Sequence, residues 1–346
     1  MAYTTITDPS AYFQTVLYSG DGGGSNAITN TGNSNLQPDF VWVKERTSTS
    51  SHALTNSTNG AGYILSSNNA DAQASANAFS SFNSDGFTVG SDGKTNESGQ
   101  TYVGWQWKAN GGTTASNSSG TITSTVQANT TAGFSIVTYT GNGSSGATVG
   151  HGLGKVPEMI FFKKTDSSKH WTVYNKTMNY SNEMYLDLDQ AETSSNFFIA
   201  DPTTSVFSIS NNAYVNNNGS SYIAYCFTSI QGYSHIGKYR GNGNADGPFT
   251  YCGFKPGWIM IKKTSGVANW MLYDSTRNPY NTVVNRLLVN TNGTENTGSG
   301  DDIDFTSNGW KVRANPAALN ENTGEFIYMA FAEHPFVASD VATTAR

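Results

Sequence analysis

The histidines of this chain do not form a metal-binding pattern. There are five of them, and they are scattered through the sequence: His52, His151, His170, His235 and His334. No His-x-His or His-x3-His pair occurs, and such a pair is what brings two imidazoles on one element to the same transition-metal ion. We therefore expect packing roles for the histidines and no transition metal.

Two groups of carboxylates have the spacing to do chemistry. Asp187 and Asp189 are two positions apart, so on a strand they would share a face. Asp301, Asp302 and Asp304 form a second acidic segment. Glycoside hydrolysis needs a second carboxylate about 5–9 Å away across a cleft, and neither group recurs elsewhere at matching positions. We expect a polar strand face at Asp187 and Asp189. At Asp301, Asp302 and Asp304 we expect a solvated loop, with a Ca²⁺ site as the alternative.

Nucleophile and nucleotide motifs do not point to catalysis either. Residues 141–146 match G-x-G-x-x-G, but a dinucleotide site needs a helix to begin at the third glycine. The segment that follows, residues 147–154, contains three more glycines and cannot sustain a helix. No Gly-x-Ser-x-Gly elbow occurs. We therefore expect a turn at residues 141–146, no catalytic residue, and no cofactor other than the alternative Ca²⁺.

The two cysteines, Cys226 and Cys252, stand between aromatic or small residues in strand-like runs. We expect buried free thiols, with a disulfide as the alternative that spacing alone does not decide.

Aromatic side chains could bind sugars, because flat rings pack against C–H-rich sugar faces while Asn and Asp bond the hydroxyls. Most of the large aromatics lie in strand-like runs, where we expect them to pack in a core: Phe40, Trp42, Trp105, Trp107, Trp171, Trp258, Trp270 and Trp310. Tyr180, Tyr214 and Tyr280 lie near asparagines outside those runs. These three tyrosines are the predicted surface residues for ligand binding.

Four sequence landmarks recur in a fixed order along the chain, which indicates three diverged copies of one module. A strand ending in Tyr leads into a Gly-Asn/Asp-Gly turn at residues 16–22, 137–143 and 237–243. A Pro then opens an apolar run that ends on Lys, at residues 38–44, 157–164 and 256–263. A short strand follows at residues 82–89, 206–209 and 305–312, and an aromatic strand closes each copy at residues 102–107, 222–227 and 326–331.

The pattern predicts an all-β protein with tandem β-sandwich-like repeats of about 100 residues. Asn-Gly and Asp-Gly steps favour hairpin turns, and no long stretch shows helical periodicity. The predicted division is module one at 1–112, a Gly/Ser/Thr/Asn-rich linker at 113–133, module two at 134–233 and module three at 234–346. The modules are either separate sandwiches or barrels, or they pack into one elongated body.

Composition narrows the class of partner. Only 13% of residues are charged, against about 25% in a typical globular domain, while 12% are aromatic. This predicts a folded protein with a surface rich in hydroxyls and amides. The net charge of −6 disfavours nucleic acid, which needs a basic surface. No run of 18 apolar residues occurs, so we expect no membrane insertion.

Several segments resemble a family of marine bacteriophage structural proteins. They are the opening residues 3–18, the Tyr-x-Gly-Asn-Gly turn, residues 151–157 (His-Gly-Leu-Gly-Lys-Val-Pro), the strand at 270–274 and the Tyr-Ile-Ala-Tyr type of closing strand. That family carries a repeated β module in tail-fibre-like and other virion proteins. The resemblance covers nearly the whole chain and implies a virion protein on an exposed surface. It implies no catalytic residues.

The resulting hypothesis is a tail fibre or receptor-binding appendage that contacts host glycans or proteins without catalysis. One alternative is a capsid decoration or head-fibre protein, and another is a tail-associated glycan depolymerase. The expected partners are other virion proteins and the host cell surface, at the tail or on the capsid exterior. Because fibres are commonly trimers, a homotrimer is one expected assembly and a monomer is the other.

Overall fold

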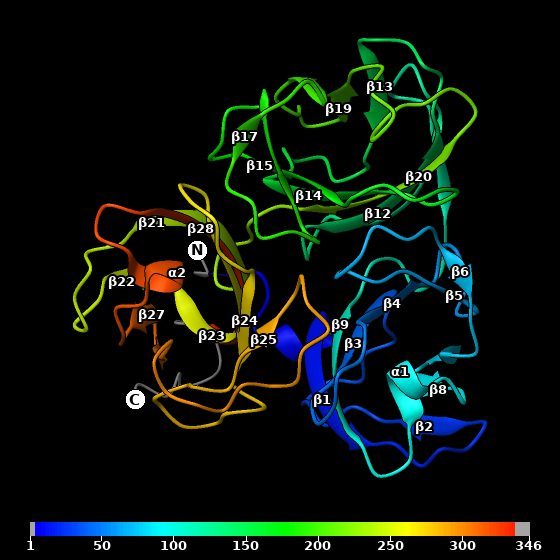
Figure 1. The fold of residues 1–346 in the computed structure, drawn as a ribbon. Helices are drawn as coiled ribbons and strands as arrows, with labels where there is room; N and C mark the ends of the chain where they lie inside the picture. Colours follow the sequence, from blue (N-terminus) through cyan, green and yellow to red (C-terminus); the bar gives the residue numbers. More distant parts are fainter. Residues whose placement is uncertain (1–3, 336–346) are drawn as a thin grey trace.

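The structure is a computed structural model and describes residues 4–335. Within that range the chain is built almost wholly of antiparallel strands, which confirms the all-β prediction. Figure 1 shows three lobes grouped around a common centre, each formed by about one third of the chain. The predicted modules also include residues 1–3 and 336–346, which lie outside the described residues.

The first third forms a large sheet of order β1-β9-β3-β4 and a small sheet of order β2-β8-β7. Their strands are β1 (Phe13–Ser19), β2 (Asn26–Ile28), β3 (Phe40–Glu45), β4 (Ala53–Asn56), β7 (Phe79–Asn83), β8 (Gly86–Val89) and β9 (Thr101–Trp107). The remaining elements are the 3₁₀ turn η1 (Pro9–Ala11), the paired strands β5 (Tyr63–Ile64) and β6 (Ala74–Ser75), and α1 (Gly93–Asn96).

The second third forms a large sheet of order β10-β11-β12-β20-β14-β15-β16-β17 and a small sheet of order β13-β19-β18. Its strands are β10 (Ala115–Asn117), β11 (Ser124–Asn129), β12 (Phe134–Thr140), β13 (Ala147–Gly150), β14 (Met159–Lys164), β15 (Thr172–Asn175), β16 (Asn182–Tyr185), β17 (Thr193–Ser194), β18 (Phe198–Ala200), β19 (Val206–Ile209) and β20 (Ser221–Phe227).

The last third forms a large sheet of order β21-β28-β23-β24-β25 and a small sheet of order β22-β27-β26. Its elements are β21 (Ser234–Arg240), β22 (Phe249–Tyr251), β23 (Phe254–Lys263), β24 (Met271–Asp274), β25 (Leu287–Leu288), β26 (Ile303–Thr306), β27 (Gly309–Val312), α2 (Ala317–Asn320) and β28 (Glu325–Pro335). The strand order β1-β9-β3-β4 thus has counterparts in β12-β20-β14-β15 and β21-β28-β23-β24.

The segment at 113–133, predicted as a linker, instead contributes two strands to the second large sheet. β11 pairs with β12, with Thr125 opposite Thr138, and β10 pairs with β11. Ile122, Ser124 and Val126 are buried while the threonines between them are exposed. This is the period-two alternation of a strand, and the abundance of small polar residues concealed it in the sequence. The other predicted module boundaries remain predictions.

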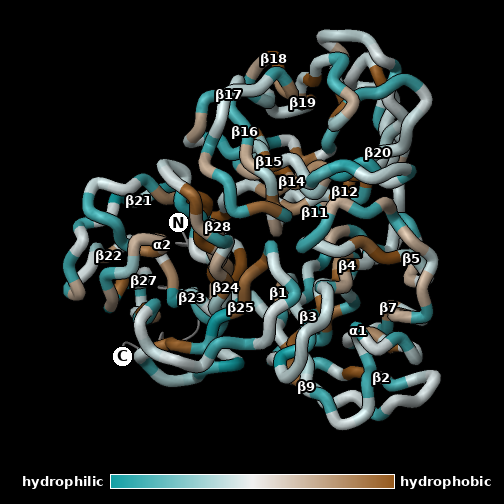
Figure 2. The backbone as a smooth tube through the Cα atoms, in the orientation of Figure 1, coloured by the Kyte–Doolittle hydropathy of each residue, from teal (hydrophilic) through white to brown (hydrophobic). Residues whose placement is uncertain are grey.

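Each large sheet is buried on both of its faces. In β3, Val41 and Val43 join an apolar cluster with the small sheet of their own sandwich, whereas Phe40 and Trp42 join a second cluster. That second cluster contains residues from all three sandwiches. Figure 2 shows hydrophobic stretches along strands that face the centre, such as β14, β24 and β28. The sandwiches therefore surround one shared core and do not form an elongated row.

Backbone hydrogen bonds join the three sandwiches head to tail in a closed ring. At each junction a loop from one large sheet meets the loop after the β3-type strand of the next. At the first-to-second junction, Gln73 N donates to Thr165 O and Lys169 N donates to Ala70 O, both at 2.9 Å. At the second-to-third junction, Glu192 N donates to Thr264 O and Ala268 N donates to Asp189 O, both at 2.9 Å. At the third-to-first junction, Glu295 N donates to Arg46 O at 2.9 Å and Ser50 N donates to Asn292 O at 3.0 Å.

One aromatic ring crosses each junction at an equivalent position. Trp171 Nε1 donates to Ser66 O (2.8 Å), and Trp270 Nε1 donates to Tyr185 O (2.9 Å). At the third junction His52 stands in place of the tryptophan, with Nε2 3.1 Å from Leu288 O. Because the Nδ1 atom of His52 accepts from Trp42 Nε1 (2.8 Å), this imidazole is neutral and donates through Nε2.

The repeated Tyr and Gly-Asn/Asp-Gly turn is held by a buried asparagine in each sandwich. In the second sandwich, Asn216 accepts from the backbone of Asn142 (2.8 Å) and donates to Ser144 O (2.8 Å). Tyr139 anchors the same segment by donating to Val215 O (2.7 Å). Gly143 has φ +69°, a backbone conformation that glycine adopts readily. Asn96 makes the corresponding bonds in the first sandwich, where it accepts from Asp21 N and donates to Gly23 O. Asn320 does so in the third sandwich, where it accepts from Asn242 N and donates to Asn244 O.

We predict that Asn216→Ala lowers the free energy of unfolding by about 1–3 kcal/mol, because it removes the buried amide that bonds Asn142 N and Ser144 O of the turn. Chemical denaturation followed by tryptophan fluorescence measures the change. Asn218→Ala, at an exposed position two residues along the chain, is the control and should leave the midpoint within error. Equal losses in the two variants would contradict the structural role of Asn216.

We also predict a pH dependence that comes from His52. Burial and the nearby charge of Lys44 lower the pKa of His52 to about 3. Between pH 6.5 and pH 3 the unfolded chain therefore binds a proton that the folded chain does not, and stability falls as the pH falls through this window. From pH 7 to pH 5 the loss is about 2 kcal/mol.

The comparison is with His52→Gln, measured by urea denaturation at both pH values. The variant should lose less stability than the wild type between pH 7 and pH 5, whatever its absolute stability. Identical losses would show that His52 does not titrate in this way.

Candidate functional site

Three buried lysines occupy equivalent positions, and the sequence analysis did not single them out. Lys44, Lys163 and Lys262 are fully buried, and burial lowers the pKa of each to about 8. A buried amine with a lowered pKa is a common feature of active sites. Here, however, the amines bond backbone carbonyls, as Lys163 Nζ does to Ala70 O (2.8 Å) across a junction. None of the three lines either cavity described below, so their role is structural.

The structure places the three predicted tyrosines differently. Tyr180 and Tyr280 are 37% and 67% exposed, in the second and third sandwiches. Tyr214 is half-buried, with its ring stacked on Phe197 (5.0 Å between centroids) and with Lys169 Nζ 5.0 Å from its centre. Tyr214 therefore packs as part of the second sandwich, and these residues do not form one common site.

The acidic segment of the third sandwich is paired with arginines. Asp301 lies 2.5 Å from Arg286, and Asp304 lies 3.2 Å from Arg313. Asp302 accepts from Gly300 N (2.9 Å). Within residues 4–335 no group of three His, Cys, Asp or Glu is arranged to hold a metal ion. The geometry therefore gives the Ca²⁺ alternative no support.

Asp187 lies beyond the end of β16 and not on its polar face. It accepts from Trp171 N (3.0 Å) and lies 2.7 Å from His170 Nδ1, which fixes the loop beside a junction tryptophan. Asp189 contributes its backbone carbonyl to the next junction. The two residues therefore hold loops at the junctions, and the predicted strand face is wrong because β16 ends at Tyr185.

Cys226 and Cys252 are free and buried, as the sequence predicted. Burial raises the pKa of both thiols, to about 12 for Cys252, so neither is an activated nucleophile. All seven tryptophans are fully buried in the described structure, which confirms their expected role in the core.

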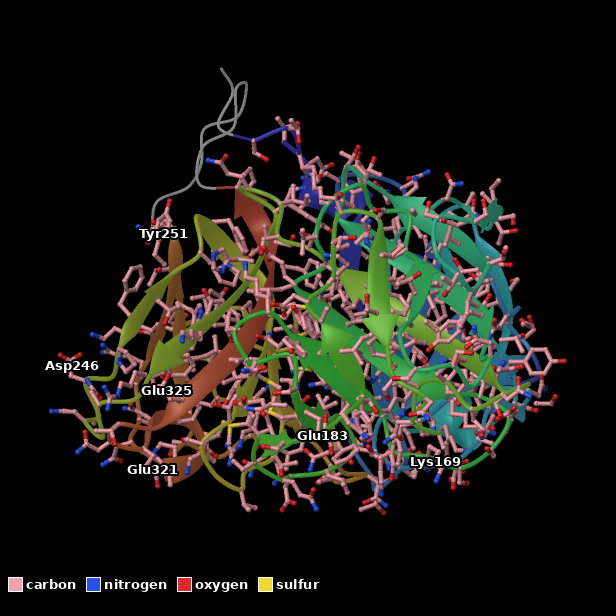
Figure 3. The ribbon with its side chains drawn as sticks, turned by 90° about the horizontal axis from the view of Figure 1, so that it is seen from above. Lys169, Glu183, Asp246, Tyr251, Glu321 and Glu325 are labelled. Atoms are coloured by element: carbon pink, nitrogen blue, oxygen red, sulfur yellow. The ribbon has the colours of Figure 1, made fainter. Side chains whose placement is uncertain are left out.

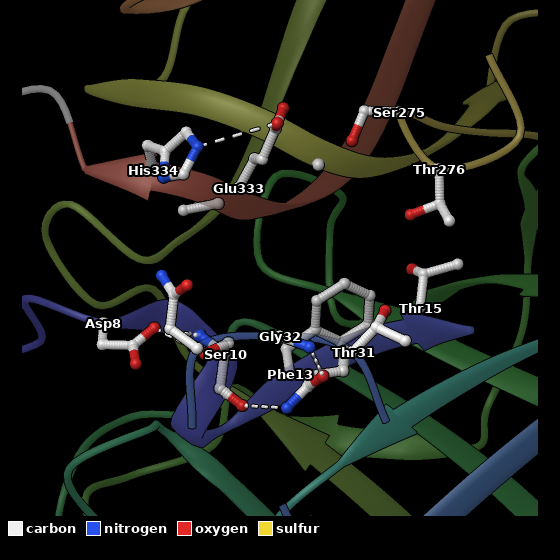
Figure 4. A pocket seen from close by; sticks show the side chains of 14 residues that line it. Asp8, Ser10, Phe13, Thr15, Thr31, Gly32, Ser275, Thr276, Glu333 and His334 are labelled. Carbon is white, nitrogen blue, oxygen red and sulfur yellow. Dashed lines mark hydrogen bonds and ion pairs between the residues drawn. The ribbon is translucent and has the colours of Figure 1, made fainter. Parts of the chain in front are cut away.

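A cavity of about 240 Å³ lies between the first and third sandwiches (Figure 4). Asp8 and Glu333 lie on opposite sides of it. Asp8 accepts from the hydroxyls of Ser10 and Ser34, both at 2.6 Å. Glu333 is 2.7 Å from Lys255. Both carboxylates are thus held by neighbouring donors, and we assign this cavity no chemistry.

This cavity lies where the ring meets the two ends of the described chain. Where the chain passes from the first sandwich to the second, and from the second to the third, an acidic residue bonds the backbone of the connecting segment. Asp39 accepts from the backbone of Ala109 (2.7 Å) and Gly111 (2.8 Å), and Glu158 accepts from Ser229 N (3.0 Å). Gly257 has the corresponding position in the third sandwich. A Cβ there would lie 3.1 Å from the Glu333 backbone, so this close approach favours glycine.

A second cavity, which we call the junction groove, lies between the first and second sandwiches and has a volume of about 430 Å³. It is lined by Asn59, Tyr63, Gln73, Thr123, Thr125, Thr138, Tyr139, Thr140, Thr165, Ser221 and Tyr222. None of these side chains is charged. The loops around β5 and β6 supply one wall, and β11, β12 and β20 supply the other.

The two walls of the junction groove are fixed relative to one another. Gln73 N donates to Thr165 O across the junction (2.9 Å). The side chain of Gln73 also accepts from Asn59 Nδ2 (2.9 Å), which orients both amides. On the facing wall Thr125 is paired opposite Thr138, and Thr140 opposite Ser221. The groove is therefore a preformed surface of amides and hydroxyls.

These features define an all-β protein in which three sandwiches close a ring around one core, with a neutral polar groove at one junction. The chain belongs to the family described as domain of unknown function DUF7483, whose model matches residues 8–335. No curated protein matches the chain, and no solved structure does either. No helix in the described range is long and apolar enough to cross a membrane.

Two of the predicted surface tyrosines should respond differently to truncation. We expect Tyr214→Ala to lower the free energy of unfolding by about 2 kcal/mol, because it removes a half-buried ring packed on Phe197. Tyr280→Ala, at a far more exposed position, should change it by less than about 0.5 kcal/mol. Denaturant midpoints measure both, and a larger loss for Tyr280→Ala would contradict the packing described above.

Proposed function

We propose that this protein is a non-catalytic component of a bacteriophage virion, a tail fibre or receptor-binding appendage that contacts glycans on the host surface. The junction groove is the observation that carries the glycan part of the proposal. Ligand sites for sugars combine a few directed polar groups with an aromatic surface. The groove has both, in the hydroxyls and amides of its walls and in Tyr63, which is 47% exposed.

The virion part of the proposal depends on the sequence resemblance to phage structural proteins. The low charge of the chain agrees with it, because neutral hydrogen-bonding surfaces keep their affinity in salty water while ion pairs are screened beyond about 8 Å. Several of the charged groups are paired on the outer surface of the third sandwich. Figure 3 shows Asp246, Glu321 and Glu325 at this edge, and Lys263 lies 2.8 Å from Glu321.

A closed ring suits a protein that acts through its surfaces. The backbone bonds at all three junctions fix the sandwiches relative to one another, so binding would not have to order them. Preorganisation of this kind reduces the entropic cost of association.

The ring also favours a second candidate, a decoration or head-fibre protein on the capsid. One chain already presents three similar lobes around a centre (Figure 1), an arrangement that could match a threefold position among coat subunits. A homotrimer remains a prediction, since a single chain completes the shared core without one.

Immunogold labelling of intact virions, with antibody raised against the recombinant protein, separates these candidates. We expect gold at the tail. Gold distributed over the head would favour the decoration protein, and virions that carry the chain on neither structure would contradict both. Antibody preadsorbed with the recombinant protein is the control for specific labelling.

A further inference from the structure

The three junctions of the ring are equivalent in backbone but differ in the chemistry of their side chains. Gln73, Glu192 and Glu295 occupy the same position, since each donates its N–H to the loop of the next sandwich. Only the first-to-second junction has a neutral amide there. At the third-to-first junction, Glu295 forms an ion pair with Arg46 (2.7 Å).

The strand that faces this position differs in the same way. β12 supplies Thr138 and Thr140 to the junction groove, where β21 has Lys238 and Arg240 at the same register. Ser221, which also lines the groove, is replaced in β28 by Glu325, and Arg240 lies 3.7 Å from that carboxylate. In β1 the corresponding residues are Leu17 and Ser19.

β11 adds a further difference: within residues 4–335 the second large sheet continues past β12 to β11 and β10, whereas the other two large sheets end at β1 and β21. It brings Thr125 next to Thr138 on the wall of the groove. Within the described part of the chain, the hydroxyls of Thr125, Thr138 and Thr140 have no hydrogen-bond partner. They are exposed or half-buried, so they are available to a ligand.

We propose that the junction groove is a binding site for a neutral saccharide, one per chain, with Tyr63 as the stacking surface and the Thr125–Thr138 pair as hydroxyl partners. The amides of Asn59 and Gln73 bond sugar hydroxyls from the opposite wall. A volume of about 430 Å³ is within the range of sites that enclose small ligands. This inference rests on the proposed glycan-binding function and adds to it the site, the stoichiometry and the class of sugar.

The exclusion of acidic sugars follows from the lining. A carboxylate-bearing sugar would lose its hydration in the groove without meeting a cation. The charged residues on either side of Thr165 in the chain are Lys164 and Asp166, and they lie 3.7 Å apart; the Asp166 carboxylate also accepts from Ser221 N (3.0 Å). This pair is already neutralised, so it offers an anionic ligand no free positive charge.

The test begins with the whole recombinant chain on a microarray of neutral and acidic bacterial glycans. Calorimetry then uses the strongest neutral glycan of the array and its counterpart that bears a uronic or sialic acid. We expect one neutral ligand bound per chain, and at least tenfold weaker binding of the acidic counterpart.

Variants then place the site. Tyr63→Ala and the double variant Thr125→Val with Thr138→Val should each weaken binding at least tenfold. The matched controls are Tyr280→Ala, which removes an exposed tyrosine of the third sandwich, and Thr193→Val, which changes an exposed strand threonine outside the groove. The controls should bind as the wild type does. Thermal melting identifies any variant that is unfolded, and Tyr63, whose side chain is exposed at the start of β5, remains testable if the double variant does not fold.

The outcomes are distinguishable. If no glycan on the array binds the wild type, both the glycan-binding function and this site are overturned. If a glycan binds but the groove variants retain full affinity, the function survives and the site is wrong. Equal affinity for neutral and acidic glycans would overturn the assigned class of sugar, and three bound ligands per chain would overturn the single site.

Discussion

The arrangement of this protein depends on one constraint, the burial of both faces of each large sheet. β3, β14 and β23 carry apolar side chains on both faces of their sheets, and the small sheet of each sandwich covers only one of the two faces. The other face must be removed from water by another part of the chain. Three sandwiches satisfy this requirement together, because the face that each small sheet leaves uncovered packs against the other two sandwiches. Aromatic rings from different sandwiches pack together in this shared core: Phe40 on Tyr225, with ring centroids 4.4 Å apart, and Phe13 on Phe331, with ring centroids 5.1 Å apart.

Polar groups inside the core then fix which side chains meet. Trp105 Nε1 donates to Asp274 of the third sandwich (3.0 Å), and Asn56 donates to the hydroxyl of Tyr225 (3.1 Å). At the remaining junction the corresponding pair is Met329 and Asn175, and Asn175 Nδ2 has no partner in the described structure. Because a buried polar group is costly without a partner, such pairs favour one alignment of the ring.

The three junctions differ in the chemistry of their side chains. Charged residues that could have lined a site, such as Arg46, Glu295 and Arg277, instead stabilise the third-to-first junction. The amines of the three buried lysines bond backbone carbonyls. The ring nitrogens of the buried histidines are hydrogen-bonded as well. The junction groove between the first and second sandwiches is lined instead by neutral hydroxyls and amides.

The sequence by itself determined the all-β class, the positions of the main strands and the burial of the tryptophans, because these follow from local periodicity, turn residues and aromatic composition. It also pointed to the turns at residues 20–22, 141–143 and 241–243, although not to the asparagines that hold them, which lie more than 70 residues away. Only the tertiary structure decided that the sandwiches close a ring, that residues 113–133 add strands, and that Asn59, Thr125 and Thr138 face a common groove. Each of these facts depends on contacts between segments far apart in the chain, and local residue patterns carry no record of such contacts. Tyr180, Tyr214 and Tyr280 were chosen by their neighbours in sequence, whereas a binding site is defined by neighbours in space.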